Sequence, residues 1–293
     1  MEKKSSSQKN ILVTGANGQL GQEFQQLEKN FPSLNFLFVS KNELSIADEN
    51  AVNTFFKNKQ IDICINCAAY TAVDKAETDK ETAIAVNAIA VGYLAKACKN
   101  HNAKFIHIST DYVFDGKGIK PFTENDQTNP VNFYGQTKLS GELNAIKENE
   151  ETIIIRTAWV YSSFGNNFVK TMIRLMNERE SIGVVNDQYG CPTFAADLAQ
   201  AIMQIIVGNN FIAGIYHYSN KGKISWYDFA KEISQQINSH CVVNEITTSQ
   251  FPTPASRPSY SVLDTSKIAE TFNITITEWK ESLQKCLVLL KSQ

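Results

Sequence analysis

A tyrosine stands four residues before a lysine in the segment NPVNFYGQTKLSGE, residues 129–142. If the chain is helical from Val131 onward, Tyr134 and Lys138 lie on one helix face, because residues i and i+4 are neighbours there. A nearby ammonium favours the phenolate and so lowers the pKa of a phenol, which is about 10 in free tyrosine. Such a tyrosine can give a proton to a carbonyl oxygen or take one from an alcohol. The alternative for this common spacing is an aromatic ring packed under a surface lysine.

Hydroxyl groups are expected beside this pair. The segment FIHISTDYVFDG, residues 105–116, predicts a strand that ends in Ser109 and Thr110. Open α/β sheets bind their ligands at the carboxyl ends of strands. Thr110 can therefore hydrogen-bond the same substrate oxygen that Tyr134 serves.

A glycine-rich turn lies near the start of the chain. The segment ILVTGANGQLGQEF places Gly15, Gly18 and Gly21 between an apolar strand and an amphipathic helix. Gly15 permits a tight turn, Gly18 lets the backbone approach a pyrophosphate, and Gly21 lets the helix pack close to the sheet. The helix N-terminus adds free N–H groups and a positive partial charge. The segment predicts a dinucleotide site.

The end of the second predicted strand helps to distinguish the two nicotinamide cofactors. An acid there binds a ribose 2′-hydroxyl and repels a 2′-phosphate. Ser40 and Lys41 occupy this place, and the first acid is Glu43. Lys41 favours NADPH, although it could equally be a solvated surface lysine, so NADH stays open.

The elements that must position these groups form an α/β pattern. Apolar, β-branched runs of strand length alternate with helix-like segments, and near-continuous apolar runs are typical of parallel strands covered on both faces. The fold class is therefore α/β, a Rossmann-like doubly wound parallel sheet with a smaller, mainly C-terminal α/β substrate-binding lobe. The five runs are residues 11–15, 36–40, 61–66, 104–110 and 152–157.

The order of these elements predicts the domain organisation. A dinucleotide-binding Rossmann domain is expected over residues 10–162, and a mainly substrate-binding lobe over 163–293. Part of 194–222 is expected to return to the first domain. Residues 1–9 are polar and lack the apolar stretch of a signal peptide, so they predict a flexible tail. The proline-rich segment 249–264 predicts a loop.

Composition excludes several functions. The net charge of −2 on 293 residues gives no reason to expect a nucleic-acid partner, and no run reaches the roughly 20 apolar residues of a membrane span. We therefore expect a cytoplasmic protein. Six cysteines are too few for a disulfide scaffold, and the C-x-x-C pair Cys64 and Cys67 lies in a predicted strand as two buried apolar side chains. The four histidines lack metal-ligand spacing, so no metal is expected.

The glycine fingerprint, the strand-end hydroxyl and Tyr-x-x-x-Lys, in this order, resemble the extended short-chain dehydrogenase/reductase superfamily. Within it the chain resembles the dTDP-4-dehydrorhamnose reductase family, the last enzymes of dTDP-L-rhamnose synthesis. The resemblance spans residues 11–258 and includes the segments NCAAYTAVDKAE, VNAIAVGYLAKAC, HISTDYVFDG, YGQTKLSGE, RTAWVY, GNNFVKTM, NDQYGCPT and PTPASRP.

This resemblance implies a reaction and three catalytic residues. NAD(P)H would deliver hydride to carbon 4 of dTDP-4-dehydro-6-deoxy-L-mannose while Tyr134 protonates the 4-keto oxygen, giving dTDP-L-rhamnose. Lys138 would hold the nicotinamide ribose and depress the tyrosine pKa. Thr110 would bond the keto oxygen.

The resemblance also implies two sets of binding residues. To the cofactor positions already named it adds Gln19, Leu20, Ser45, Ile46, Ala69, Tyr70, Thr71 and Ile108. The positions around the substrate are Val73, Thr110, Asp111, Tyr112, Trp159, Asn186 and Arg257. The alternatives are core filling for Trp159 and a loop-to-surface ion pair for Arg257.

Two positions depart from the family pattern. Leu44-Ser45-Ile46 stands where relatives usually show Leu-Asp-Ile, so the adenine contact of that aspartate is weakened or rerouted. Some relatives dimerise through carboxylates that share a magnesium ion, but Ala196 stands at one such place, although Glu23 is retained. We therefore expect a monomer or weak homodimer without a metal bridge.

Two other functions stay open at this point. The first is a ketoreductase for another nucleotide 4-keto sugar, because its catalytic residues would be the same. The second is a non-catalytic NADP-binding regulatory subunit that resembles the one of methionine adenosyltransferase. The presence of Thr110, Tyr134 and Lys138 favours catalysis.

Overall fold

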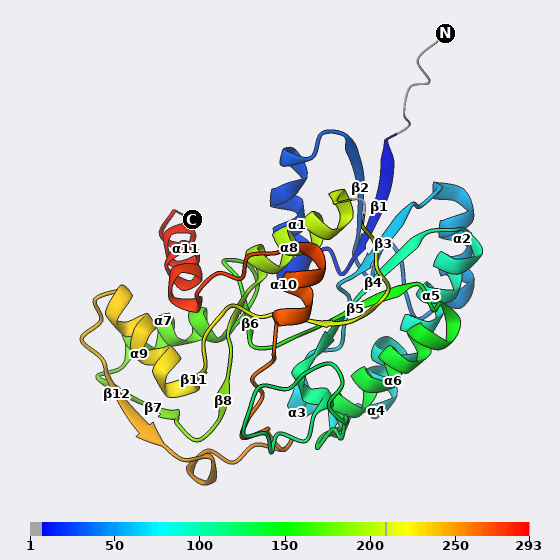
Figure 1. Cartoon of the computed structure of the whole chain (residues 1–293). Helices are drawn as coiled ribbons and strands as arrows, with labels where there is room; N and C mark the ends of the chain where they lie inside the picture. The colour runs from blue at the N-terminus through cyan, green and yellow to red at the C-terminus, as the bar shows by residue number, and fades with distance from the viewer. Residues whose placement is uncertain (1–7, 209, 293) are drawn as a thin grey trace.

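A six-stranded parallel sheet forms the centre of the computed structural model, which describes residues 8–208 and 210–292 (Figure 1). The strand order is β10-β5-β4-β3-β1-β2, which confirms the predicted doubly wound α/β class. The strands are β1 (Lys9–Thr14), β2 (Leu34–Val39), β3 (Ile63–Asn66), β4 (Lys104–Thr110), β5 (Thr152–Thr157) and β10 (Gly214–His217).

The sheet is buried on both faces, because its strands alternate apolar side chains toward two separate cores. In β5, Ile153 and Ile155 pack into the first core, and Ile154 packs into the second. One face is covered by α1 (Gln19–Leu27), α8 (Ala195–Val207) and α10 (Ser266–Phe272). The other is covered by α2 (Glu49–Lys59), α5 (Ala90–Asn100) and α6 (Phe133–Glu148). Figure 1 shows both helix layers around the sheet.

Short helices line the carboxyl end of the sheet. They connect the strands to the covering helices: α3 (Val73–Ala76), α4 (Lys80–Ile84), the π-helical turn η2 (Ala85–Ile89) and η3 (Asp111–Val113). The turn η1 (Glu28–Asn30) instead joins the end of α1 to the start of β2, at the amino end of the sheet.

The chain after β5 builds a smaller lobe beside the sheet (Figure 1). Its helices are α7 (Phe168–Glu178), α9 (Trp226–Gln236) and α11 (Trp279–Lys291). Its strands are β6 (Val160–Tyr161), β7 (Ser181–Val185), β8 (Tyr189–Gly190), β9 (Thr193–Phe194), β11 (Ile224–Ser225) and β12 (Val242–Ile246), followed by the turn η4 (Thr248–Gln250). Phe229, Trp279 and Leu283 belong to the core of this lobe.

The chain passes back to the sheet between these segments. Helix α8 packs against α1, and β10 pairs in parallel with β5, so Ile215 lies opposite Ile154. Both elements fall within residues 194–222. The predicted flexible tail falls largely on residues 1–7, which lie outside the described residues, whereas β1 begins at Lys9.

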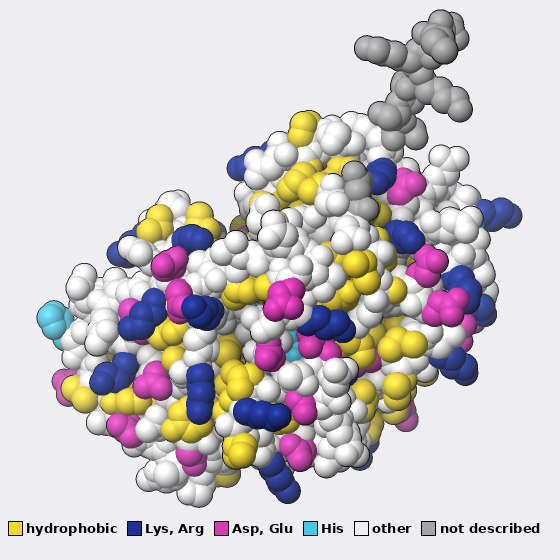
Figure 2. All heavy atoms as spheres, in the orientation of Figure 1, with side chains coloured by type: hydrophobic (Ala, Val, Ile, Leu, Met, Phe, Trp, Pro, Cys, Tyr) yellow, Lys and Arg dark blue, Asp and Glu magenta, His cyan; other side chains and the backbone are white. Residues whose placement is uncertain are grey.

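The surface carries charges of both signs. Figure 2 shows Lys and Arg side chains interspersed with Asp and Glu side chains on one face. Among the residues that the structure describes, no helix is both long and apolar enough to cross a bilayer. All six cysteines are free thiols. Cys64 is buried in β3, but the prediction that Cys67 is also buried was wrong, because it follows the strand end and is partly exposed.

Candidate active site

A cleft of about 930 Å³ lies at the carboxyl ends of the central strands. Its walls are the glycine turn after β1, the segments that follow β2, β3, β4 and β5, and the first turns of α6. This size is in the range of small-molecule sites, and the carboxyl edge is where open α/β sheets bind ligands.

The glycine turn needs glycine at two positions. Gly15 has a φ of +68°, and a Cβ there would stand 2.7 Å from the backbone nitrogen of Ala68. At Gly21 a Cβ would collide with the carbonyl oxygen of Gly15, so only glycine lets α1 start this close to the strand. The turn directs the N-terminus of α1, with its free N–H groups, to the cleft.

The same turn leaves room for a ligand. A Cβ on Gly18 would meet only the carbonyl oxygen of Gly15, at 3.2 Å, so the backbone is open on its outer side. N–H donors, a helix N-terminus and this open backbone fit the pyrophosphate of a dinucleotide.

The start of α6 is fixed from two sides. Asn132 is the N-cap, and its Oδ1 accepts a hydrogen bond of 2.8 Å from the backbone N–H of Gly135. Its Nδ2 donates to the carbonyl of Ser256 at 2.8 Å, while the N–H of Phe133 donates to Glu77 Oε1 at 2.9 Å. The helix thus begins two residues later than the predicted Val131, which still leaves Tyr134 and Lys138 on one face.

Tyr134 is buried at the wall of the cleft. Its ring packs edge-on against Tyr112, with centroids 5.6 Å apart and an interplanar angle of 78°. Burial raises the pKa of Tyr134 to about 12, which the Thr110 hydroxyl partly opposes and the Asp111 carboxylate reinforces. The predicted lowering of this pKa was therefore wrong: loss of hydration dominates. At neutral pH the phenol is protonated, so it is a proton donor.

Lys138 is buried and points to strand β4. Its Nζ donates to the carbonyl of Ile108 at 2.7 Å and lies 3.4 Å from Nε2 of His107. Burial lowers the pKa of Lys138 to about 8, while the neighbouring Glu142 and Cys67 act in the opposite direction. Since only 2% of this residue is exposed, the alternative of a surface lysine above the ring is excluded.

Thr110 and Asp111 complete the wall at the end of β4. Thr110 Oγ1 donates to Asp111 Oδ1 at 3.0 Å and accepts from the N–H of Tyr112 at 3.3 Å. Burial raises the pKa of Asp111 to about 6. These bonds hold the Thr110 hydroxyl beside the phenol of Tyr134.

The cleft collects most of the predicted site residues. Every predicted cofactor position lines it: Gly15, Gly18, Gln19, Leu20, Gly21, Ser40, Lys41, Ser45, Ile46, Ala69, Tyr70, Thr71, Ile108, Tyr134 and Lys138. Five of the predicted substrate positions do so as well: Val73, Thr110, Asp111, Tyr112 and Trp159.

Two predicted substrate residues lie outside this lining. Asn186 donates from Nδ2 to Glu245 Oε2 at 2.7 Å. Arg257 forms an ion pair of 2.8 Å with Asp74, which is the arrangement considered as its alternative. The charge of Arg257 nevertheless acts on the pKa of Tyr112, so this guanidinium lies near one end of the cleft.

Trp159 has an unusual backbone and a stacked partner. Its φ of 48° is in the left-handed region, which a bulky residue rarely adopts. Its ring stacks on Trp226 of α9, with centroids 3.5 Å apart and planes at 9°. The smaller lobe thereby supports a cleft wall. No pattern in the sequence predicted this role for Trp226, which lies 67 residues after Trp159.

Other cleft residues were missed from the sequence. Thr157 ends β5 as Thr110 ends β4, so the same strand-end rule applied to residues 152–157 would have found it. Cys67 follows β3 at the same edge. Asn166 lies in the loop before α7 and carries no local signal.

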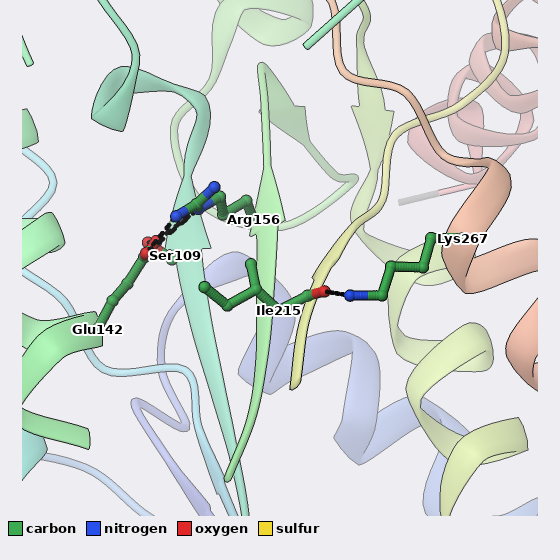
Figure 3. Close-up of polar contacts among 5 residues, drawn as sticks. All are labelled: Ser109, Glu142, Arg156, Ile215 and Lys267. Atoms are coloured by element: carbon green, nitrogen blue, oxygen red, sulfur yellow. Dashed lines mark hydrogen bonds and ion pairs between the residues drawn. The ribbon is translucent and has the colours of Figure 1, made fainter. Parts of the chain in front are cut away.

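Behind the cleft, a buried ion pair ties α6 to the sheet (Figure 3). Arg156 of β5 donates from Nη2 to Glu142 Oε2 at 2.7 Å, and Ser109 Oγ donates to Glu142 Oε1 at 2.5 Å. Figure 3 also shows Lys267 of α10, which donates to the carbonyl of Ile215 at 2.7 Å. Helices on both faces are thus bonded to the sheet, α6 to the strands β4 and β5 beside the cleft and α10 to the edge strand β10.

Acidic groups are not arranged as a metal site in the described part of the chain. No group of three or more His, Cys, Asp and Glu side chains there could hold a metal ion. Glu23 is buried, accepts a hydrogen bond of 2.6 Å from Ser162 Oγ, and has its pKa raised by burial.

Comparisons with known proteins agree with one another. The family model described as the RmlD substrate binding domain matches residues 9–292. A dTDP-4-dehydrorhamnose reductase of Aggregatibacter actinomycetemcomitans is 39% identical over 284 residues, covering 94% of this chain and 97% of the relative.

Solved structures extend this similarity. The crystal structure of a dTDP-4-dehydrorhamnose reductase from Clostridium acetobutylicum is 44% identical with a TM-score of 0.92, and the match covers 96% of this chain and 99% of that one. That of the Bacillus anthracis reductase in complex with NADP is 38% identical with a TM-score of 0.93 and the same coverage.

Proposed function

The chain belongs to the RmlD family of dTDP-4-dehydrorhamnose reductases, and from this membership we propose that it catalyses that reaction. It reduces the 4-keto group of dTDP-4-dehydro-6-deoxy-L-mannose to dTDP-L-rhamnose with NADPH or NADH. The observation that carries the proposal is the meeting of Tyr134, Thr110 and Lys138 in one cleft with the glycine turn of β1.

The cleft residues suggest how the cofactor is held. The turn at Gly18, Gln19 and Leu20 would bind the pyrophosphate, because the N-terminus of α1 offers N–H donors there. The segment 69–71 and Ile108 would line the nicotinamide end, with Lys138 on the ribose. Ser40, Lys41, Ser45 and Ile46 would surround the adenosine end. When bound, the dinucleotide supplies the hydride.

Tyr134 is the residue that we assign to proton transfer. With a pKa of about 12 it holds its proton at pH 7. The Thr110 hydroxyl would turn its proton from Asp111 to the same keto oxygen and orient that oxygen toward the phenol. Lys138 is mostly charged at pH 7, since its pKa is about 8, and this charge would stabilise the phenolate that remains.

The substrate would extend from this point toward the smaller lobe. Val73, Asp111, Tyr112 and Trp159 line that part of the cleft. Arg257 would reach the diphosphate if its ion pair with Asp74 opens, and a guanidinium suits that group. A role of Asn186 toward the nucleotide stays a prediction.

We also propose how the chain is organised. Residues 10–162 would bind the dinucleotide and 163–293 mainly the substrate, with part of 194–222 in the first domain, as the packing of α8 on α1 supports. The protein would act in the cytoplasm, which suits six free cysteines, as a monomer or weak homodimer without a nucleic-acid partner.

The test is turnover by the purified protein with the 4-keto sugar nucleotide generated in situ. NADPH oxidation is followed by absorbance, and the product is identified by mass spectrometry and NMR. We expect dTDP-L-rhamnose, and a loss of about 10²- to 10⁴-fold in kcat for Tyr134→Phe with NADPH affinity retained. Turnover of a different keto sugar alone, or cofactor binding without turnover, would contradict the proposal.

A further inference from the structure

A row of polar side chains crosses the middle of the sheet beneath the cleft. Thr14 of β1, Asn66 of β3 and His107 of β4 lie opposite one another in the strand registers, and each is completely buried. They occupy the face that α6 covers, and the row ends at Lys138. Buried polar groups in such a place are kept only when they are bonded to one another.

The hydrogen bonds of the row have a defined direction. The hydroxyl of Thr14 donates to Asn66 Oδ1 at 2.6 Å and accepts from the N–H of Ala68 at 3.3 Å. This leaves Asn66 Nδ2 facing His107 Nδ1 at 3.0 Å, and an amide nitrogen can only donate. Nδ1 is therefore the acceptor, and the neutral ring carries its proton on Nε2.

The Nε2–H of His107 faces the amino group of Lys138. The two nitrogens are 3.4 Å apart, and Nζ also bonds to the carbonyl of Ile108. A donor that points at Nζ favours the free amine over the ammonium, because only the free amine can accept a hydrogen bond. Burial keeps the pKa of His107 well below its ordinary value, so the ring is neutral across the working pH range.

We propose that His107, oriented by Thr14 and Asn66, is a positioning residue that holds the Lys138 amino group in place and makes it release its proton more readily. This rests on the proposed function of Lys138. A lysine with a lowered proton affinity can reprotonate the phenolate of Tyr134 after each turnover, directly or through intervening hydroxyls, with a larger driving force than an ordinary lysine would have.

Other charged and titratable groups face Lys138 from the surrounding elements. Glu142 on α6 favours the ammonium, but Arg156 of β5 neutralises that carboxylate. Cys67 after β3 acts in the same direction as Glu142, and Asp111 of η3 acts on Tyr134. All of these groups stay unchanged in the variants below, which isolates the contribution of the imidazole.

Two substitutions of His107 separate its two nitrogens. His107→Asn retains a polar group near Nδ1, within reach of Asn66, but nothing at Nε2. His107→Gln can place its amide N–H where Nε2–H stands. We expect the asparagine variant to move the alkaline limb of kcat/KM upward by about 0.5–1 pH unit, a 3- to 10-fold change in proton affinity, while the glutamine variant stays near the wild type.

A direct titration of Lys138 accompanies the kinetics. The protein is labelled with 13C at lysine Cε, and the Lys138 resonance is the one that Lys138→Met removes. Its midpoint should rise in His107→Asn and not in His107→Gln. Because this titration needs no sugar substrate, it separates failure of this proposal from failure of the proposed reaction.

A third variant tests the proposal without changing His107, in case the His107 variants do not fold. Thr14→Val is close to isosteric and does not itself line the cleft, although its neighbour Gly15 and its bonding partner Ala68 do. The change releases the amide of Asn66 to rotate and turn its oxygen to Nδ1. The ring proton then moves to Nδ1, so Nε2 accepts from the ammonium and the Lys138 midpoint rises. An unchanged midpoint in His107→Asn and Thr14→Val, or equal shifts in the two His107 variants, would overturn the proposal.

Discussion

Glu142 and Arg156 form a two-point ion pair in the interior of the protein, with Nη2 to Oε2 at 2.7 Å and Nε to Oε1 at 2.9 Å. Only 1% and 3% of the two side chains are exposed. Glu142 is on the helix face of Tyr134 and Lys138, one turn further along. The pair therefore fixes the rotation and height of the helix that carries the proposed proton donor.

Loss of one partner of this pair should be costly. Glu142→Gln leaves the Arg156 guanidinium buried without its counter-charge, and we expect the free energy of unfolding to fall by about 3–5 kcal/mol. Glu178→Gln is the matched control, since its pair with Arg174 is more than half exposed. That change should cost less than about 0.5 kcal/mol. Urea denaturation measures both, and similar losses in the two variants would contradict the interpretation.

Lys138→Met should stabilise the protein at pH 7 while it abolishes most of the turnover. The native pKa of about 8 is below the ordinary 10.5, so burial of the charged lysine costs stability at every pH below 8. That cost disappears as pH rises from about 8 to 10.5. After allowance for the lost bond to Ile108, we expect a gain of about 2 kcal/mol at pH 7 and none at pH 10.5. Urea denaturation of the wild type and Lys138→Met at the two pH values measures this difference. A lower free energy of unfolding for the variant at pH 7 would contradict the cost of burying the charged lysine.

Lys41→Asp should lower the preference for NADPH over NADH. Lys41 lies at the cleft edge, while the carboxylate of neighbouring Glu43 is held by the N–H of Ser40 at 2.7 Å. An acid at residue 41 would repel a 2′-phosphate and accept a hydrogen bond from a 2′-hydroxyl. The ratio of kcat/KM with NADPH to kcat/KM with NADH should therefore fall about tenfold or more. Lys57→Asp on the exposed side of α2 is the control for net charge. Equal NADPH/NADH ratios in Lys41→Asp and Lys57→Asp would show that Lys41 does not determine the cofactor preference.

Trp226→Ala should weaken sugar-nucleotide binding without touching the cofactor. Its ring supports Trp159 from behind, and a stacked aromatic pair contributes about 0.5–1.5 kcal/mol beyond its buried area. We expect KM for the sugar nucleotide to rise by about 2- to 12-fold with an unchanged Kd for NADPH. A weaker NADPH affinity would show instead that the smaller lobe shapes the cofactor end of the cleft.

The sheet could be predicted because its signal is local. The limits of β4 and β5 coincide with the apolar runs 104–110 and 152–157, since strands buried on both faces need apolar residues at nearly every position. The spacing of the glycine turn was also a local signal, and the atoms that exclude a side chain at Gly21 belong to Gly15 and Ala16. At Gly15 they belong to Cys67 and Ala68 after β3, which no local pattern showed.

The electrostatics of the site could not be predicted in this way. A spacing of four residues placed Tyr134 and Lys138 on one face, yet the sign of the tyrosine pKa shift depends on how deeply Tyr112 and its neighbours bury the phenol. Trp226 and the partner of Arg257 likewise come from segments far along the chain. Such contacts arise only when the two lobes pack, so no local pattern encodes them.

The cap of α6 joins parts of the chain that are far apart in sequence. Asn132 Oδ1 caps the helix locally, while its Nδ2 donates to the carbonyl of Ser256, 124 positions later. A protein truncated before Ser256 would therefore keep the helix cap and lose this tether between the start of α6 and the C-terminal part of the chain.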